Sequence, residues 1–382
     1  MNYGMRAIKL HKKKRGKIEI RSKVKLETRD DLSVAYTPGV GAVCNEIAHD
    51  KKKSWELTNR ANQVAVVCDG TAVLGLGDIG PEAGMPVMEG KAVIFKEFAG
   101  IDAIPLCIAT KDTEEIVRFC KLIEPSFAGI NLEDISAPRC FDILDRLEKE
   151  LSIPVFHDDQ DGTAIVTLAA LINACRVSNK AIRDLKIVIN GGGAAGFAVA
   201  RLILTQNPKD LIMLDSKGII YDGRLNMNSY KQAIAKKTNR KKIKGDLSAA
   251  IKGADVFIGL SKANLMTSEM VRTMNLNPFI FAMANPVPEI MPDEAKKGGA
   301  YIIGTGRSDF SNQINNALVF PGIFRGLLDG GVKKVTKEMK ISSAIALAYS
   351  VKKPTVDKIL PNITEKKVVK IIARAIINKN NK

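Results

Sequence analysis

A glycine-rich turn near the middle of the 382-residue chain constrains its fold more than any other segment. Residues 185–189 are apolar except for Lys186 and predict a buried strand, and an apolar helix is expected after the glycines. Gly191, Gly193 and Gly196 have the G-x-G-x-x-G spacing, in which glycines let the backbone approach a pyrophosphate at a helix N-terminus. A strand, this turn and a helix in that order predict a Rossmann-type dinucleotide-binding domain.

An acidic residue stands where such a domain binds the ribose of its dinucleotide. The next predicted strand, 211–214, is followed by Asp215, about 20 residues after the glycines. The apolar segments 254–260 and 278–283 are expected to continue the same sheet. Asp215 favours NAD because it would repel a 2′-phosphate, whereas Lys217 nearby could accept one, so the choice between NAD and NADP stays open. The candidate cofactor-binding residues are Gly191, Gly193, Ala194, Ala195, Gly196 and Asp215.

Two pairs of adjacent acids, 133–134 and 158–159, each follow a predicted strand. The strands are 127–132 and 153–157, and the amphipathic helix 138–151 connects them. A strand–helix–strand unit makes its two strands parallel, so their carboxyl ends lie at one edge of the sheet. Four carboxylates therefore converge on the crevice in which open α/β sheets bind ligands.

Adjacent carboxylates repel one another, and a shared cation offsets this repulsion. With no histidine or cysteine ligand among the converging groups, the expected ion is a hard divalent cation, Mg²⁺ or Mn²⁺. The acids concerned are Glu133, Asp134, Asp158 and Asp159. The alternative for a single acid, Asp159 or Asp161, is a cap on the apolar helix 163–175. His157 continues the strand and is interpreted as a hydrogen-bonded core residue or a residue behind the ligands.

Lys91 and Lys96 are candidate general bases in the predicted helix 86–99. Both have apolar neighbours along the helix, so either is expected to be desolvated. Desolvation lowers the pKa of a lysine and suits it to accept a proton. The periodicity does not choose between the two, and either side chain can instead extend its ammonium group to water.

Tyr36 precedes Thr37 and Pro38, which predict the cap and the first residue of a helix. The positive end of the helix dipole would favour ionisation of the phenol. The alternative, which this segment alone favours, is a packing residue with a satisfied hydroxyl.

Three asparagines follow later in the chain. Asn285 leaves the predicted strand 278–283 and could hold a substrate carboxylate or the nicotinamide ribose. Asn315 and Asn316 precede an apolar run, which would place their amides at the rim of a cleft. Each asparagine is alternatively a turn or cap residue.

The net charge of +17 raises the question of a nucleic-acid partner. The lysines are spread along the chain, 5% of the residues are aromatic, and no nucleic-acid-binding motif is present, so a solvated basic surface is favoured. No apolar run reaches the roughly 20 residues that span a bilayer, and the basic N-terminus lacks the apolar segment of a secretory signal. Six cysteines without a C-x-x-C pair indicate reduced core residues in a cytoplasmic protein. Residues 1–30 are expected to form an arm or an edge hairpin.

Nearly the whole chain resembles the small bacterial or archaeal type of malic enzyme. The blocks that carry the resemblance are Y-T-P-G at 36–39, L-G-L-G-D at 74–78, E-G-K at 89–91, L-E-D at 132–134, H-D-D at 157–159, G-T-A at 162–164, the glycine turn at 191–196, A-N-P at 284–286, and N-N at 315–316 before F-P-G at 320–322. So many blocks in the same order would not be expected by chance.

The resemblance implies oxidative decarboxylation of L-malate to pyruvate and CO₂ with reduction of NAD(P)⁺. It implies that Glu133, Asp134 and Asp159 hold the Mg²⁺ or Mn²⁺ ion, which binds the malate hydroxyl and C1 carboxylate. The implied fold is α/β, with a substrate- and metal-binding domain at 1–161, a Rossmann NAD(P)-binding domain at 162–334, and C-terminal helices at 335–382.

The resemblance also implies the catalytic groups. It singles out Lys91, assisted by Asp158, as the base that removes the C2 hydroxyl proton, and Tyr36 as the acid that protonates enolpyruvate. The implied substrate-binding residues are Asn285, with Asn315 or Asn316. The expected partners are a small-molecule substrate and a second copy of the chain in a homodimer, with no nucleic acid and no membrane.

Two departures from the family pattern and three rival functions remain. Larger eukaryotic-type members carry an arginine before the L-G-L-G block, but here residues 71–73 are uncharged, so other groups, such as the backbone of 75–80, must hold the distal carboxylate. The phosphotransacetylase-like C-terminal domain of some bacterial relatives is not expected. The rivals are a malolactic-type lyase, a metal-dependent oxaloacetate decarboxylase with a vestigial cofactor loop, and a basic nucleic-acid-binding protein.

Overall fold

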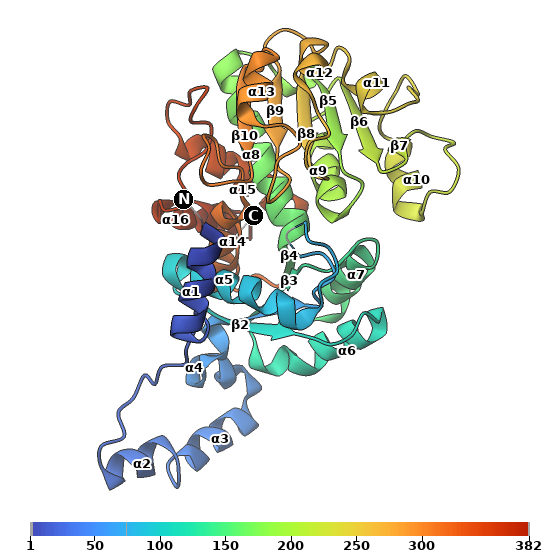
Figure 1. Ribbon diagram of the computed structural model, residues 1–382. Helices are drawn as coiled ribbons and strands as arrows, with labels where there is room; N and C mark the ends of the chain where they lie inside the picture. The colour runs from blue at the N-terminus through green and yellow to red at the C-terminus, as the bar shows by residue number, and fades with distance from the viewer. Residues whose placement is uncertain (1–2, 74, 381–382) are drawn as a thin grey trace.

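The computed structural model describes residues 3–73 and 75–380 and contains two sheets, one in each half of the chain (Figure 1). The predicted α/β class is confirmed. Leu74, the first residue of the L-G-L-G-D block, lies outside the described residues.

The first half is built on a four-stranded sheet. Its elements are α1 (Tyr3–Lys14), α2 (Arg29–Ala35), α3 (Val40–His49), α4 (Ser54–Leu57), β1 (Gln63–Cys68), α5 (Pro81–Ala99), β2 (Asp102–Cys107), α6 (Thr113–Ile123), β3 (Gly129–Glu133), α7 (Arg139–Glu150), β4 (Val155–His157) and the π-helical turn η4 (Asp158–Gly162). The strand order is β2-β1-β3-β4, and every neighbouring pair is parallel.

The second half is built on a six-stranded sheet. Its elements are α8 (Thr163–Ser178), β5 (Lys186–Asn190), α9 (Ala194–Leu204), β6 (Asp210–Asp215), β7 (Gly218–Ile219), α10 (Ser229–Ala235), α11 (Leu247–Ile251), β8 (Val256–Gly259), α12 (Ser268–Arg272), β9 (Phe279–Ala282), α13 (Pro292–Lys297), β10 (Ile302–Thr305), the 3₁₀ turn η6 (Asn316–Leu318), α14 (Phe320–Asp329), α15 (Lys337–Ser350) and α16 (Lys367–Asn380). The strand order is β10-β9-β8-β5-β6-β7, and the β6–β7 pair is antiparallel.

The register of β3 and β4 brings the two acid pairs to one sheet edge. The strands are parallel, and Leu132 pairs with His157, so the acids that follow both strands leave the same edge. The connecting helix α7 is amphipathic and buries one face, which includes Phe141 and Leu147. The predicted strand–helix–strand unit is therefore confirmed, with boundaries within two residues of those expected.

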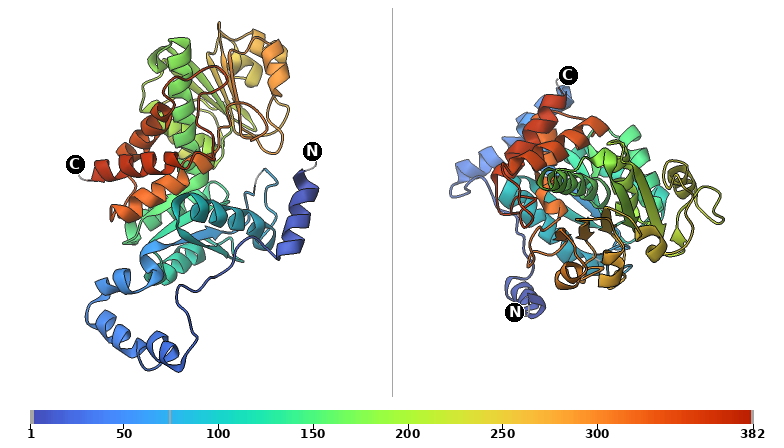
Figure 2. Two further views of the ribbon diagram at one scale, coloured as in Figure 1. Left: turned by 90° about the vertical axis from the view of Figure 1, so that its left-hand side faces the viewer. Right: turned by 90° about the horizontal axis from the view of Figure 1, so that it is seen from above.

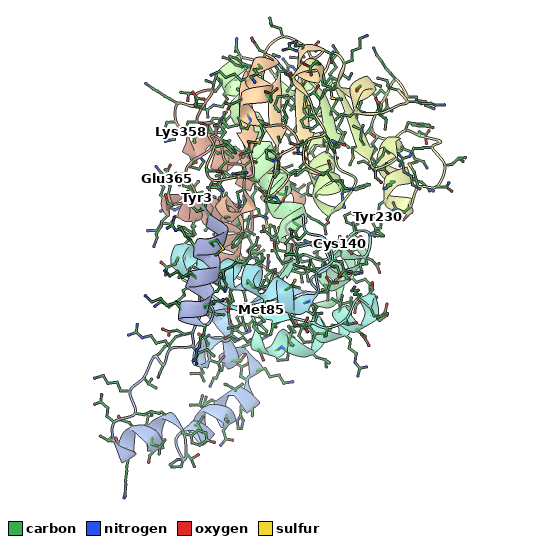
Figure 3. All side chains as sticks on the ribbon, in the orientation of Figure 1. Tyr3, Met85, Cys140, Tyr230, Lys358 and Glu365 are labelled. Carbon is green, nitrogen blue, oxygen red and sulfur yellow. The ribbon has the colours of Figure 1, made fainter. Side chains whose placement is uncertain are left out.

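Helix α8 joins the two halves. It runs from the edge of the first sheet into the second half (green in Figures 1 and 2), and 11 of its 16 residues are buried. The halves also meet where Tyr230 on α10 reaches α7, with its ring 4.7 Å from the ring of Phe141 (Figure 3). The C-terminal helices return to the first half, where Phe320 on α14 lies 4.7 Å from Phe95 on α5, measured between ring centroids.

Helices α2 and α3, with the turn between them, form an arm that projects from the first half (Figures 1 and 2). Neither helix contains a buried residue. The predicted helix start at Thr37 and Pro38 is wrong: the amides of Gly39 and Val40 donate to Ser33 O and Tyr36 O in an intervening turn, and α3 begins at Val40. Within residues 3–30, the hairpin alternative is wrong, because α1 occupies Tyr3–Lys14 and no strand lies between α1 and α2.

Two further expectations can be compared with the structure. Among the described residues, no helix is long and apolar enough to cross a membrane. All six cysteines are free thiols, but Cys44 on the arm is exposed and Cys107 is partly exposed, so only the other four are core residues as predicted.

Candidate active site

A cavity of about 800 Å³ lies between the two sheets, where the carboxyl ends of β3, β5 and β9 meet. The predicted site residues that line it are Lys91, Glu133, Asp134, Asp159, Gly193, Ala194, Ala195, Asn285, Asn315 and Asn316. Asp158, Gly191, Gly196 and Asp215 are not on its wall, and neither is Tyr36, which is 66% exposed on the arm.

Three acids of the sheet edge form one cluster. Carboxylate oxygens of Glu133, Asp134 and Asp159 all lie within 4.8 Å of one another. The backbone amide of Asp134 donates to Asp159 Oδ2 at 2.8 Å, and Asp134 itself adopts a left-handed φ of 54°. Burial, together with mutual repulsion, raises the pKa of Glu133 to about 7, of Asp134 to about 9 and of Asp159 to about 6.

These residues fit a hard divalent cation. Asp134 Oδ2 is buried and has no hydrogen-bond partner in the described part of the chain. Such an orphaned carboxylate oxygen is costly unless a cation or proton meets it. The donor set consists of carboxylate oxygens alone, which suits Mg²⁺ or Mn²⁺.

The fourth acid of the edge pairs with a lysine instead. Asp158 has no exposed surface, and its Oδ2 forms a close ion pair with Lys91 Nζ, which also lies 3.0 Å from Glu133 Oε1. Asp158 needs the neighbouring glycine, because a Cβ on Gly162 would lie 1.8 Å from Asp158 Oδ1. Burial raises the pKa of Asp158 to about 7.

The two candidate lysines differ sharply in position. Lys91 is 9% exposed, and its ammonium lies 4.5 Å from the ring centroid of Phe320. Lys96 is on the outer face of α5 and pairs with Asp102 at 2.7 Å. Burial acts to lower the pKa of Lys91, but Asp158 and the cluster acids raise it more, so the predicted lowering is wrong for the protein without bound cations.

His157 is fully buried, as predicted. The hydrogen bonds that were expected for its ring are absent among the described residues. Neither ring nitrogen has a hydrogen-bond partner among the described residues, and Asp159 Oδ2 lies 3.7 Å from Nδ1. Burial lowers the pKa of His157 to about 4, so the ring is neutral near pH 7. His157 therefore contacts the cluster through Asp159 and does not line the cavity itself.

The glycine turn has the backbone geometry that the spacing predicts. A Cβ on Gly196 would lie 1.8 Å from Gly191 O, so only glycine permits this approach. Helix α9 begins at Ala194, and the first-turn amides of such a helix favour an anion. A Cβ on Gly193 would meet no protein atom within 4 Å.

Asp215 ends β6 as predicted, but two cations already surround its carboxylate. Arg224 Nη2 and Lys231 Nζ each lie 2.5 Å from Asp215 Oδ2. Burial acts to raise the pKa of Asp215, and the two cations lower it further than burial raises it. The isolated acid of the sequence interpretation is therefore part of a cluster with an excess of positive charge.

The asparagines divide between two roles. Asn315 Oδ1 accepts from Ala317 N at 2.9 Å and caps η6, which is the alternative interpretation of this residue. Asn316 Oδ1 lies 3.5 Å from Lys91 Nζ. Asn285 lines the cavity at the end of β9.

Sequence reasoning missed several residues that build this site. Arg139 Nη2 binds Asp69 Oδ2 at 2.5 Å and Thr71 Oγ1 at 2.6 Å, and Thr71 N donates to Asp134 O. This network ties β1 to the acid cluster. The signal available in the sequence was the polar D-G-T segment directly after an apolar strand, which also ends at the ligand-binding edge. Lys17, Arg224 and Lys231 carried no local signal, because each meets its partner only through the tertiary fold.

Comparisons with known proteins place this geometry in one family. The family model described as "Malic enzyme, NAD binding domain" matches residues 160–380, and "Malic enzyme, N-terminal domain" matches 15–117 and 109–148. A bifunctional malic/malolactic enzyme of Bacillus subtilis is 52% identical over 97% of this chain and 91% of its own length. A probable NADP-dependent malic enzyme of Rickettsia prowazekii is 48% identical over 95% of this chain, which spans 48% of that longer protein. The crystal structure of an NAD-dependent malic enzyme from Thermotoga maritima superposes with a TM-score of 0.94 at 46% identity, covering 97% of this chain and 98% of that one.

Proposed function

The chain belongs to the malic enzyme family, and from this premise we propose which of its residues carry the reaction. Malic enzymes are oxidoreductases that convert malate and NAD⁺ or NADP⁺ to pyruvate, CO₂ and the reduced cofactor. One observation supports the assignment most: three acids that fit a divalent cation lie beside a buried lysine–aspartate pair, on the wall of the cavity that the glycine turn also lines.

Glu133, Asp134 and Asp159 are the proposed ligands of Mg²⁺ or Mn²⁺. Their close oxygens and the orphaned Asp134 Oδ2 support this assignment. A cation bound there supplies a Lewis acid for the hydroxyl and carboxylate oxygens of malate.

Lys91 is the proposed base for the C2 hydroxyl. In its neutral amine form, Lys91 Nζ accepts that proton as hydride leaves C2 for the nicotinamide, and Asp158 holds the side chain in position. Because Glu133 contributes to the high pKa of Lys91, any cation that neutralises Glu133 opposes that effect. Oxidation at C2 yields a β-keto acid, whose distal carboxylate leaves as CO₂.

The cofactor and substrate occupy opposite ends of the cavity in this proposal. The turn from Gly191 to Gly196 and the N-terminus of α9 receive the pyrophosphate, with Asp215 at the ribose end. The proposed substrate groups are the amides of Asn285, Asn315 and Asn316. The proposed domains are 1–161 for substrate and metal, 162–334 for the cofactor, and 335–382 for the C-terminal helices.

We also propose that the active form is a homodimer in which the arm of one chain supplies Tyr36 to the cavity of the other. The enolpyruvate carbon needs a proton donor, and Tyr36 is not on the wall of the cavity of its own chain. The arm exposes Leu32, Val34, Val40 and Val43, and helices this short are marginal without packing. A second copy that covers this apolar surface would satisfy both requirements. The free thiols support a reducing, cytoplasmic location.

The metal and base assignments are tested together. Purified chain, L-malate, Mn²⁺ and NAD⁺ or NADP⁺ are expected to give pyruvate and reduced cofactor. Asp159→Asn should abolish the turnover that depends on Mn²⁺. Lys91→Met should lower kcat by roughly 10²–10⁴-fold. Lys96→Met is the matched control, since this lysine lies on the outer face of the same helix. Normal Mn²⁺-dependent turnover by Asp159→Asn would refute the metal assignment.

A second activity, direct conversion of malate to lactate and CO₂, is supported by the relative from Bacillus subtilis, which is named a bifunctional malic/malolactic enzyme. Formation of lactate from malate, in an assay with Mn²⁺ and an amount of NAD⁺ far below that of malate, would establish this activity. Pyruvate and reduced cofactor in equal amounts, with no lactate, would leave the oxidative reaction alone.

A further inference from the structure

Lys17 is an uncommitted cation on the wall of the cavity. Among the cavity-lining residues that the structure describes, Lys17 and Lys91 are the only lysines or arginines, and Lys91 is paired with Asp158 and Glu133. Lys17 Nζ donates to Pro86 O at 2.7 Å, and no carboxylate within the described ranges forms an ion pair with it. An ammonium group has three donors, so two remain for a ligand.

The surrounding residues hold Lys17 at this place. Its backbone amide donates to Glu89 Oε2 at 3.2 Å, which fastens the chain after α1 to α5. Gly90, the residue before Lys91, has no side chain, and a Cβ there would lie 3.3 Å from Lys17 Nζ. The ammonium of Lys17 therefore rests on the face of α5 that also carries Lys91 into the cavity.

The acidic residues of the cavity make a second cation necessary for binding a dicarboxylate. Malate carries two carboxylates. In the proposed function, a cation held by Glu133, Asp134 and Asp159 would take the hydroxyl and the C1 carboxylate, which leaves the C4 carboxylate without a partner. The C4 carboxylate would then enter a cavity whose wall carries Glu133, Asp134 and Asp159, and to which Ala72 contributes no charge. The other cation of the wall, Lys91, is already paired with Asp158 and Glu133. A carboxylate removed from water requires a cationic or hydrogen-bonding partner.

We propose that Lys17 binds the C4 carboxylate of malate and thereby selects dicarboxylic over monocarboxylic hydroxy acids. This inference rests on the proposed function, because it presupposes malate in this cavity. It adds a specificity-determining residue to the metal ligands, base and asparagines assigned above.

The chemistry of the leaving group predicts how Lys17 contributes to the rate. The C4 carboxylate departs as neutral CO₂, so its ion pair with Lys17 is stronger with bound malate than in the transition state of carbon–carbon cleavage. An interaction of that kind lowers KM and does not raise kcat. Loss of Lys17 should therefore raise the KM for malate while kcat stays unchanged or increases.

The test compares Lys17→Met, Lys17→Arg and the control Lys23→Met, whose lysine is exposed and bonded to Asn59 Oδ1. For Lys17→Met the KM for malate should rise roughly 10- to 100-fold, as expected for a lost hydrogen bond to a charged group, with the KM for NAD(P)⁺ unchanged. Lys17→Arg should restore much of the loss. Inhibition by oxalate, which can chelate the cation but has no distal carboxylate, should not change.

The outcomes separate this inference from the proposed function. A wild-type chain that does not turn over malate would refute the proposed function. A wild-type chain that does, together with a KM for malate within about twofold of wild type in Lys17→Met, would refute only the role of Lys17. A parallel loss of oxalate inhibition or a fall in kcat alone would also overturn it, because Lys17 would then act at the C1 end or on the chemical step.

Discussion

The residues around Asp215 set the charge of the ribose end of the cofactor site. One carboxylate meets two cations, Arg224 and Lys231, so the local balance is one positive charge. A bare aspartate repels the 2′-phosphate of NADP, whereas this cluster can attract it. At the proposed ribose site, the charge next to Asp215 therefore comes from residues 9 and 16 positions after the acid that the sequence fingerprint identifies.

We predict that the chain accepts NADP⁺ as well as NAD⁺, and that Lys231→Met lowers kcat/KM for NADP⁺ roughly tenfold more than for NAD⁺. The lost ammonium is one of the two that offset Asp215. Initial rates with each cofactor, at fixed malate and Mn²⁺, measure the ratio. Lys242→Met is the control, since its ammonium lies at an exposed site, 3.8 Å from Asp222 Oδ2. Equal losses with both cofactors would show that Lys231 supports the fold of this loop and not the 2′-phosphate.

The same contrast between local pattern and tertiary contact separates the two lysines of α5. Periodicity gave both Lys91 and Lys96 apolar neighbours, and what distinguishes them is the packing of α14 against α5, which places Phe320 beside Lys91. That contact joins residues more than 200 positions apart, so no helical pattern contains it. The acids that are proposed as metal ligands could be found because they stand at the ends of two apolar strands.

At the scale of elements, the βαβ unit and the glycine turn were predictable because their constraints are local. The parallel pairing of β3 and β4 follows from the length of the helix between them, and it alone brings the acid pairs together. Helices α1 and α2 were not predicted, because neither has a buried face that would impose an apolar period, and α3 begins two residues after the predicted start. The strand β10 (Ile302–Thr305) was missed although β8 and β9 are equally short, because the glycines around it, at 298–299, 304 and 306, indicate a loop.

Replacing either of two glycines of the turn by alanine should affect a different property, thermal stability at Gly196 and cofactor binding at Gly193. Gly196→Ala places a Cβ 1.8 Å from Gly191 O, so the turn must shift and the protein should lose several degrees in Tm. Gly193→Ala meets no protein atom within 4 Å, so its Tm should stay near wild type. Its Cβ would instead obstruct the pyrophosphate, and the KM for the cofactor should rise. Thermal unfolding and cofactor titration of both variants check this, and an equal fall in Tm for both would contradict the separation of roles.

At the scale of the whole molecule, the cavity depends on parts that are far apart in the chain. The first sheet supplies the acids, the second supplies the glycine turn, and α14 returns from the C-terminal region to close the wall beside Lys91. The arm (Figure 1) helps to form neither sheet nor cavity, and Tyr36 lies in its turn between α2 and α3. Its exposed apolar residues need a partner for the arm to be stable, which gives the dimer proposal a direct test.

Mixed dimers of Tyr36→Phe and Lys91→Met chains decide whether Tyr36 acts across the interface. Each variant alone should lose roughly 10²–10⁴-fold in kcat, because each lacks one proton-transfer group in every site. If the arm reaches the other chain, a mixed dimer has one site with an intact lysine and an intact tyrosine, and about half of wild-type activity returns. If Tyr36 acts within its own chain, each site of the mixed dimer lacks one group and activity stays lost. The two chains, carrying different tags, can be co-expressed and the mixed species purified through both. A chain that is monomeric at assay concentration, yet fully active, would refute the dimer proposal itself.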